Sequence, residues 1–192
     1  DAVVHCRSQA EAEAMLEAIE RRLQDCLLTI HPAKSKVVYC KDSNRLLDYP
    51  QTQFTFLGFT FRPRVAANRS GKRFTSFLPA VSDEAMKRMR QTIKGWNLNR
   101  QTSATLERLA QQYNAILRGW WNYYGSFYQT EMRKLFDYFN RRLATWARRK
   151  YKKLKYHKVR SFQWLSRVAN RQPRLFFHWQ ILGCNDRIMG AV

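Results

Sequence analysis

The sequence predicts an α+β fold in which a small sheet-containing unit precedes a bundle of helices. Before Pro79, large apolar residues alternate with small ones at 54–61, which is the period of a strand, and after Pro79 apolar residues recur three and four apart. The charge changes near the same place: residues 1–81 carry a net charge of +4, and residues 82–192 carry +17. We therefore expect one unit at 1–81 and a helical unit at 82–192.

The first unit should contain a strand, a helix, a second strand and a hairpin. A short buried strand is predicted at 2–6. Ser8 with Glu11 three residues later forms a capping box, which should begin a helix that Pro32 ends. The predicted apolar face of this helix consists of Ala12, Leu16, Ile19, Leu23 and Leu27.

The second half of this unit is expected to be strand-rich. A strand is predicted at 36–40, and large apolar residues alternate with small ones at 54–61 as in one long strand. Asn-Arg-Ser-Gly at 68–71 is a turn signal, so 73–78 should return as the partner strand of a hairpin.

The second unit should be built from helices that begin at polar N-cap residues. Ser82 should cap the first helix and Thr102 or Ser103 the next, which should end near Gly125. A third helix should start near Thr130 and bury Met132, Leu135, Phe136, Phe139, Leu143 and Trp146. The apolar residues Val159, Phe162, Leu165 and Val168 mark a fourth helix that Pro173 ends.

The helix before Gly125 combines an apolar stripe with polar residues on another face. The stripe consists of Leu106, Leu109, Tyr113, Ile116, Leu117, Trp120 and Tyr124. Because these residues recur at steps of three and four, we expect Trp120 and Tyr124 to be core. Arg118 and Asn122 should be wholly or partly exposed and available to a partner.

The overall charge indicates a polyanionic partner. Lys and Arg number 35 against 14 acids, which gives a formal charge of +21 and a pI near 10.5. Nucleic acid is the first partner to consider, and an anionic membrane surface is the second. No apolar run of about 18 residues could span a bilayer, and no signal peptide is evident. The four cysteines do not have the spacing of a zinc site: Cys6, Cys26, Cys40 and Cys184. We expect them to be reduced, mostly buried thiols of an intracellular protein.

A basic run between Arg141 and Arg160 is the strongest candidate for a nucleic-acid site. It holds ten basic residues and no acid, with Trp146, Tyr151 and Tyr156 interleaved. Such a surface fits a phosphate backbone and unpaired bases, although a solvated charged face is the alternative. We expect phosphate or base contacts at Arg141, Arg142, Arg148, Arg149, Lys150, Tyr151, Lys152 and Lys153.

Catalytic motifs are scarce. The chain has no glycine-rich phosphate loop and no His-Cys metal cluster, and its four histidines are isolated. Asp1 precedes the predicted strand at 2–6, where two-metal nucleotidyl transfer would place a Mg²⁺ ligand. A single aspartate cannot hold two metals. Because the chain begins at Asp1 without an initiator methionine, we expect it to be part of a longer protein.

Four blocks in order resemble the reverse transcriptases encoded by group II introns, and together they cover most of the chain. Asp1-Ala2-Val3-Val4 resembles the end of the Tyr-Ala-Asp-Asp turn. Lys-Ser-Lys at 34–36 and Phe-Leu-Gly-Phe at 56–59 are similar to the next two palm blocks. Leu-Arg-Gly-Trp-Trp-Asn-Tyr-Tyr at 117–124, with the basic segment 141–153, resembles the thumb or maturase-specific X domain.

The resemblance implies a partial palm at 1–81 and a thumb/maturase domain at 82–192. It implies intron RNA and an RNA/DNA primer–template as partners, intron splicing, and RNA-directed DNA synthesis with Mg²⁺ in an intact parent that also has fingers and the rest of the palm. Asp1 would belong to the metal-binding turn, and Lys34, Lys36, Leu57 and Gly58 would lie in palm segments near the primer. No cofactor or polymerase activity is expected of this chain alone.

Two other functions remain open at this point. The chain could come from a splicing cofactor that binds RNA and never polymerises. A DNA-binding protein of the helix-turn-helix kind is less favoured, since no short recognition-helix pair stands out. The resemblance places the protein inside a bacterial cell or an organelle, associated with nucleic acid.

Overall fold

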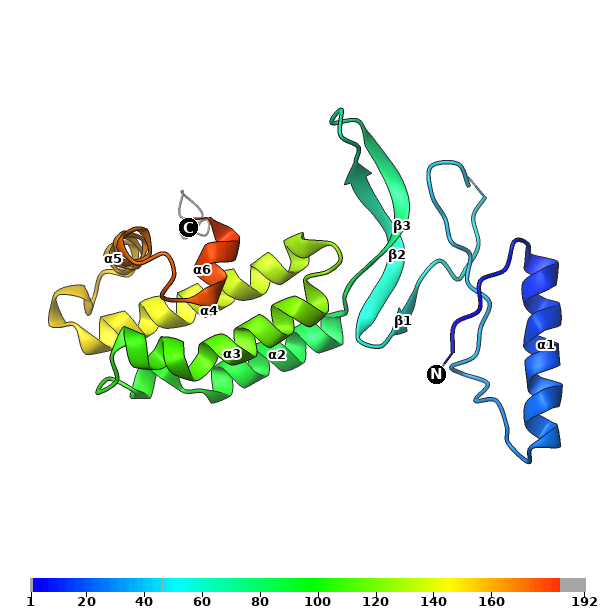
Figure 1. The fold of residues 1–192 in the computed structure, drawn as a ribbon, viewed down its shortest axis with the longest axis horizontal. Helices are drawn as coiled ribbons and strands as arrows, with labels where there is room; N and C mark the ends of the chain where they lie inside the picture. The colour runs from blue at the N-terminus through cyan, green and yellow to red at the C-terminus, as the bar shows by residue number, and fades with distance from the viewer. Residues whose placement is uncertain (1, 46, 184–192) are drawn as a thin grey trace. The chain divides into compact units, whose positions relative to one another are not determined.

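The structure is a computed structural model that describes residues 2–45 and 47–183 (Figure 1). Contacts within the chain divide it into two compact units, Asp1–Leu78 and Pro79–Val192. The first unit contains one helix and most of a small antiparallel sheet, and the second is helical. The predicted α+β class is therefore confirmed.

Helix α1 (Gln9–Asp25) begins where the capping box predicts. Ser8 Oγ accepts a hydrogen bond from Glu11 N at 3.2 Å, and the Glu11 carboxylate accepts one from Arg7 N at 2.7 Å. The helix ends before Pro32, because Leu27 adopts a φ of 56°, which a right-handed helix cannot continue.

In the described structure, no residue on the predicted apolar face of α1 is fully buried. Ala12, Leu16, Ile19 and Leu23 are half-buried, and no residue of α1 is buried. Leu27 is 95% exposed. The period of the pattern thus identified the helix, but it did not ensure a surface for the helix to pack against.

Neither of the two early strands forms. Residues 2–6 and 36–40 have no strand structure, so both predictions are wrong. Tyr39 N donates to Gln51 O at 2.8 Å, but no ladder extends from this bond in the described part of the chain. A strand requires a neighbour that satisfies its backbone groups along its length, and an apolar run does not supply that neighbour.

The segment 54–61 forms a hairpin rather than the single predicted strand. Strand β1 (Phe54–Phe56) pairs antiparallel with β2 (Phe59–Ala67), with Phe54 opposite Phe61. Leu57 and Gly58 form the turn with φ values of 48° and 80°, and two positive φ angles are the hallmark of a type I′ hairpin turn. The Phe54 and Phe61 rings stack with centroids 4.7 Å apart.

The second hairpin forms as predicted. Strand β3 (Arg73–Val81) follows β2 in a sheet of order β1-β2-β3, and Figure 1 labels the three strands. In the intervening turn, Gly71 N donates to Asn68 O at 3.0 Å, and Gly71 has a φ of 81°. A β-carbon at that angle is strained, so glycine suits this position.

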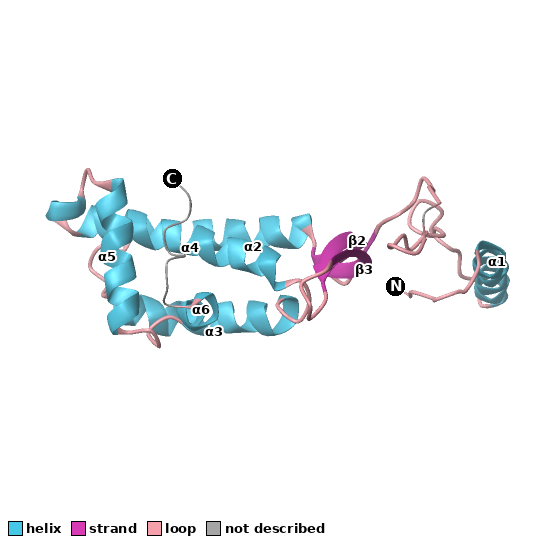
Figure 2. Ribbon diagram, turned by 90° about the horizontal axis from the view of Figure 1, so that it is seen from above, coloured by secondary structure: helices cyan, strands magenta, loops and turns pink. Residues whose placement is uncertain are grey.

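The helical unit contains three helices that run alongside one another and a fourth at a steep angle to them. In Figure 2, α2 (Asp83–Gly95), α3 (Leu106–Tyr124) and α4 (Gln129–Lys150) run lengthwise, and α5 (Lys158–Arg171) runs across their direction and packs against α4. Short 3-10 helices η1 (Leu98–Arg100) and η2 (Lys152–Leu154) precede α3 and α5, and α6 (Phe177–Leu182) closes the described part.

Caps explain where these helices begin, with one correction. Ser82 Oγ accepts a hydrogen bond from Ala85 N at 3.2 Å and begins α2, as predicted. Thr105 caps α3 through Arg108 N at 3.3 Å, so the predicted caps Thr102 and Ser103 are wrong. All three residues can accept this bond, and the path of the loop after η1 decides which one does.

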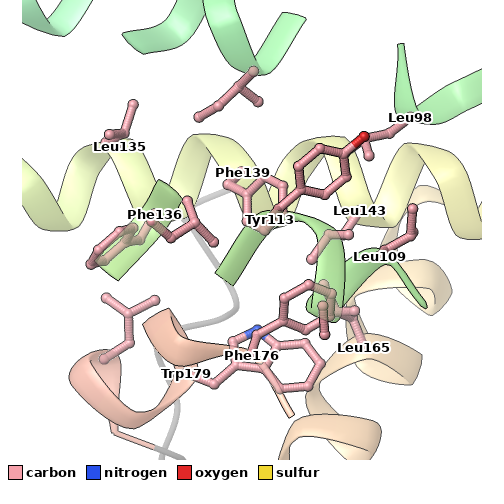
Figure 3. Close-up of a cluster of buried hydrophobic side chains, with 14 of the residues drawn as sticks. Leu98, Leu109, Tyr113, Leu135, Phe136, Phe139, Leu143, Leu165, Phe176 and Trp179 are labelled. Atoms are coloured by element: carbon pink, nitrogen blue, oxygen red, sulfur yellow. The ribbon is translucent and has the colours of Figure 1, made fainter. Parts of the chain in front are cut away.

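Helix α4 is the centre of the core. It contacts every other helix of the unit, and each of its predicted core residues from Met132 to Trp146 is fully buried. Figure 3 shows Phe136, Phe139 and Leu143 projecting from α4 toward Phe176 and Trp179. The short helix α6, which the sequence analysis did not predict, supplies Trp179 to this cluster.

Several predicted core positions lie at the margin. On α3, Trp120 and Tyr124 are half-buried and Ile116 is 39% exposed, so the predicted stripe is wider than the buried face. On α5, Val159 is exposed and Phe162 and Val168 are half-buried, whereas the predicted Leu165 is fully buried together with Ser161 and Ala169, which were not predicted. Small residues let α5 approach closely, and a search for large apolar residues misses them.

The cysteine prediction is partly wrong. Cys6 and Cys40 are half-buried and Cys26 is exposed, all as free thiols, whereas Cys184 lies outside the described residues. Burial raises the pKa of the Cys40 thiol above its ordinary value, against an opposing effect of Arg45. Within residues 2–45 and 47–183, no helix has the length and apolar character needed to cross a membrane.

Candidate nucleic-acid interface

The basic run occupies the C-terminal half of α4, η2 and the first turn of α5. Leu143, Trp146 and Ala147 face the core, which leaves the other side of α4 to solvent. We call the exposed cations of this stretch the basic surface: Arg141, Arg149, Lys152, Lys153, Lys155, Lys158 and Arg160.

No acid lies within the basic surface. From Tyr138 to Asn185 the sequence contains no Asp or Glu. Asp137, one turn before Arg141, is the last acid before this stretch. Its own burial raises the pKa of the Asp137 carboxyl, against the opposing effects of Arg141 and Arg133. The cations of the basic surface therefore have few intramolecular partners to neutralise them.

Two predicted phosphate contacts are held more closely against the bundle than the rest. Arg142 and Arg148 are half-buried, and the Nε atom of each is buried without a hydrogen-bond partner among the described residues. Arg148 Nη2 donates to Thr145 Oγ1 at 3.2 Å. Because part of each side chain is buried, these two residues contribute to packing as well as to charge.

Lys150 has a structural role that the sequence did not reveal. Its Nζ donates to Thr102 O at 2.8 Å and to Ala104 O at 2.7 Å, and it lies 5.5 Å from the centroid of the Trp146 ring. Two of the three ammonium donors thus hold the loop before α3 against the end of α4. Trp146 Nε1 holds the same loop through Gln101 O at 2.9 Å.

The interleaved aromatic residues differ sharply in exposure. Trp146 is fully buried, and Tyr151 is half-buried with its ring centroid 5.1 Å from that of Trp164. Burial raises the pKa of Tyr151, and the nearby Glu107 carboxylate adds to the effect. Tyr156 is 82% exposed. The sequence analysis named Tyr156 in the run but did not include it among the site residues, because periodicity does not separate these rings.

The two polar residues of α3 are exposed as predicted. Arg118 and Asn122 both face solvent. The Arg118 guanidinium lies over the Phe177 ring, 5.5 Å from its centroid, so part of its surface contacts the start of α6. Asn122 O accepts a hydrogen bond from Ser126 Oγ at 3.3 Å.

The remaining predicted site residues belong to the first unit. Lys34 and Lys36 are exposed, and Lys36 Nζ lies 3.4 Å from Gln51 Oε1. Leu57, 60% exposed, and Gly58 form the turn between β1 and β2. Asp1 lies outside the described residues. Within the part of the chain that the structure describes, no group of three or more His, Cys, Asp or Glu residues could hold a metal ion.

Comparison with protein families assigns the segment that carries the basic surface. Residues 86–164 match the family model of the group II intron, maturase-specific domain. Searches among curated proteins and solved structures found no match to the chain. The family match extends from α2 into α5 and includes Arg118, Asn122 and the whole basic surface. It confirms the resemblance to the C-terminal part of a group II intron maturase.

Proposed function

We propose that this chain binds the intron RNA through its basic surface. Residues 86–164 match the group II intron, maturase-specific domain, which implies a role in group II intron splicing. The observation that carries the proposal is an acid-free set of exposed cations within that domain. The bound RNA would be held in a splicing-competent fold.

Electrostatics supports this assignment. A protein with a net charge of +17 over residues 82–192 repels itself, and a phosphate backbone supplies the missing countercharge. Each Lys or Arg that contacts a phosphate releases condensed counterions, which makes the affinity strongly dependent on salt. The exposed cations have few acids nearby, so RNA would not first have to break many ion pairs.

The proposal extends to a longer parent. There, palm segments that include Lys34, Lys36, Leu57 and Gly58 would approach a primer–template, and Asp1 would join other carboxylates in holding Mg²⁺ for RNA-directed DNA synthesis. Support for this part is the sequence resemblance alone. A parent that assists splicing without polymerising is the second candidate, and the family match favours it equally. In both cases the protein would act inside the cell with its RNA.

The salt dependence of RNA binding tests the interface. The variant Arg149→Gln/Lys152→Gln/Lys153→Gln removes three cations of the basic surface. Lys87→Gln/Arg88→Gln/Arg90→Gln is the matched control, since it removes three exposed cations of α2. Fluorescence anisotropy with a group II intron RNA domain across a salt series gives the slope of log affinity against log salt.

We expect the basic-surface variant to lower that slope by about two to three units, at about 0.7–0.9 per lost contact. The control variant should keep the wild-type slope. Equal losses in the two variants would mean that RNA responds only to net charge, and an unchanged slope in the first would mean that the run is a solvated face.

A further inference from the structure

The basic surface is hollowed where η2 leads into α5. The hollow has a volume of about 450 Å³ and is lined by Tyr156, His157, Lys158, Val159, Arg160 and Gln163. Small-molecule sites span about 300–1,000 Å³, so one nucleotide fits within this volume. The lining combines the Tyr156 ring, the basic side chains of Lys158 and Arg160, and the hydrogen-bonding side chains of His157 and Gln163, which are the components that a nucleotide requires.

Tyr156 is the only aromatic residue of the basic run whose ring is largely open to solvent in the described structure. It is 82% exposed, whereas Trp146 is buried and Tyr151 packs beside Trp164. Lys155 Nζ lies 5.1 Å from the centroid of the Tyr156 ring. An exposed ring with a cation beside it can stack on a base while the ammonium approaches a phosphate.

The cations of the hollow are placed where a helix by itself disfavours them. Lys158 and Arg160 lie in the first turn of α5, which contains no acid, and the N-cap residue His157 makes no side-chain capping bond. The N-terminal end of a helix dipole repels positive side chains and attracts anions. A phosphate at this end would offset that repulsion, in agreement with the lining of the hollow.

We propose that Tyr156 and this hollow bind one unpaired nucleotide of the RNA, with the base stacked on the Tyr156 ring and its phosphate beside Lys158 and Arg160. This inference rests on the proposed RNA-binding function and adds a preference to it. Phosphate contacts along the basic surface serve any RNA, whereas a base can reach the hollow only where it is unpaired. Tyr156 would thus favour bulges and loops over continuous duplex.

The test compares two RNAs and two variants. One RNA is a hairpin stem with a single-nucleotide bulge, and the other is the same stem fully paired. Tyr156→Ala removes the ring, and Tyr156→Phe keeps it as the matched control. We expect Tyr156→Ala to bind the bulged RNA about 5- to 150-fold more weakly, the equivalent of one stacked base. Affinity for the paired stem and the salt slope should not change, and Tyr156→Phe should bind as the wild type does.

A second measurement reports stacking directly. With 2-aminopurine at the bulge, binding of the wild type should quench its fluorescence, and Tyr156→Ala should not. Tryptophan emission and denaturant melts of the variant should match those of the wild type, because this side chain is largely exposed.

An equal loss for both RNAs, or no loss for either, would overturn the nucleotide site while leaving the salt-slope result of the basic surface intact. Failure of the wild type to bind either RNA would overturn the proposed function and this inference together.

Discussion

Acid should destabilise the helical unit through one buried histidine. His178 on α6 is fully buried, and its Nε2 lies 2.7 Å from Asn140 Oδ1 on α4. Trp179 Nε1 also donates to Asn140 Oδ1, at 3.1 Å. Since that oxygen only accepts, His178 must carry its proton on Nε2, and a second proton would have to enter at Nδ1. That atom is buried with no partner among the described residues.

The magnitude follows from the pKa difference between the folded and unfolded chain. Burial lowers the pKa of His178 from its ordinary 6.5 to about 3. Because the folded value lies below the unfolded one, the unfolded chain binds the proton first. The stabilisation is complete above pH 6.5 and is lost as the pH falls toward 3, by about 1.4 kcal/mol per pH unit. Between pH 7.5 and 5 the loss should be about 2 kcal/mol.

Tryptophan fluorescence can follow this unit separately, because all six tryptophans lie between Trp96 and Trp179. Urea melts of the full chain at pH 7.5 and pH 5 should be compared between the wild type and His178→Gln. The difference between the two proteins removes the contribution of other groups, including Asp137, whose raised pKa acts in the opposite direction. His157→Gln, at an exposed histidine, is the matched control and should keep the wild-type dependence on pH. Parallel pH dependences in the wild type and His178→Gln would refute the reasoning.

Three further predictions concern packing and the role of single residues. Lys150→Met should lower the free energy of unfolding by about 1–3 kcal/mol, because the carbonyls of the loop before α3 lose their donor, and should leave the salt slope of RNA binding nearly unchanged. Lys153→Met should instead lower the salt slope and leave the free energy of unfolding nearly unchanged. Denaturant melts and a salt series measure the two effects. Gly125→Ala should cost about 1–3 kcal/mol in melts, since its β-carbon would lie 2.5 Å from Trp121 O and 2.7 Å from the Trp121 ring; a neutral result would mean that this end of α3 relaxes freely. Phe139→Ala should cost about 3–5 kcal/mol and half-buried Trp120→Ala less, so the opposite order in melts would contradict the burial assigned to α3.

Local signals in the sequence were sufficient to predict structure where nearby residues satisfy the backbone hydrogen-bonding groups. Ser8 and Ser82 begin α1 and α2, and Gly71 closes the second hairpin, as predicted. The apolar period of α4 was also sufficient, because every residue of its predicted stripe is fully buried in the core cluster of the unit. The charge asymmetry and the maturase-like blocks likewise lie in the sequence itself.

Pairing in the first unit could not be deduced in the same way. The apolar runs at 2–6 and 36–40 have the composition of strands, but strand formation depends on a neighbour that the pattern does not specify. At 54–61, alternation continues through a turn, because Leu57 and Gly58 occupy two positions and leave the period of two unbroken. One strand and a tight hairpin therefore look alike in sequence.

The sequence by itself determined helices α1 to α5, the caps Ser8 and Ser82, the position of the basic run and the match to the maturase-specific domain. Only the tertiary structure decided which members of that run are exposed. Lys150 and Lys153 are the same side chain in the same run, but one is held by two carbonyls while the other is exposed. Tyr151 and Tyr156 differ in the same way. The reason is that burial and hydrogen bonding depend on groups far away in the chain, from Thr102 to Trp164, whereas periodicity reports only the few residues on either side.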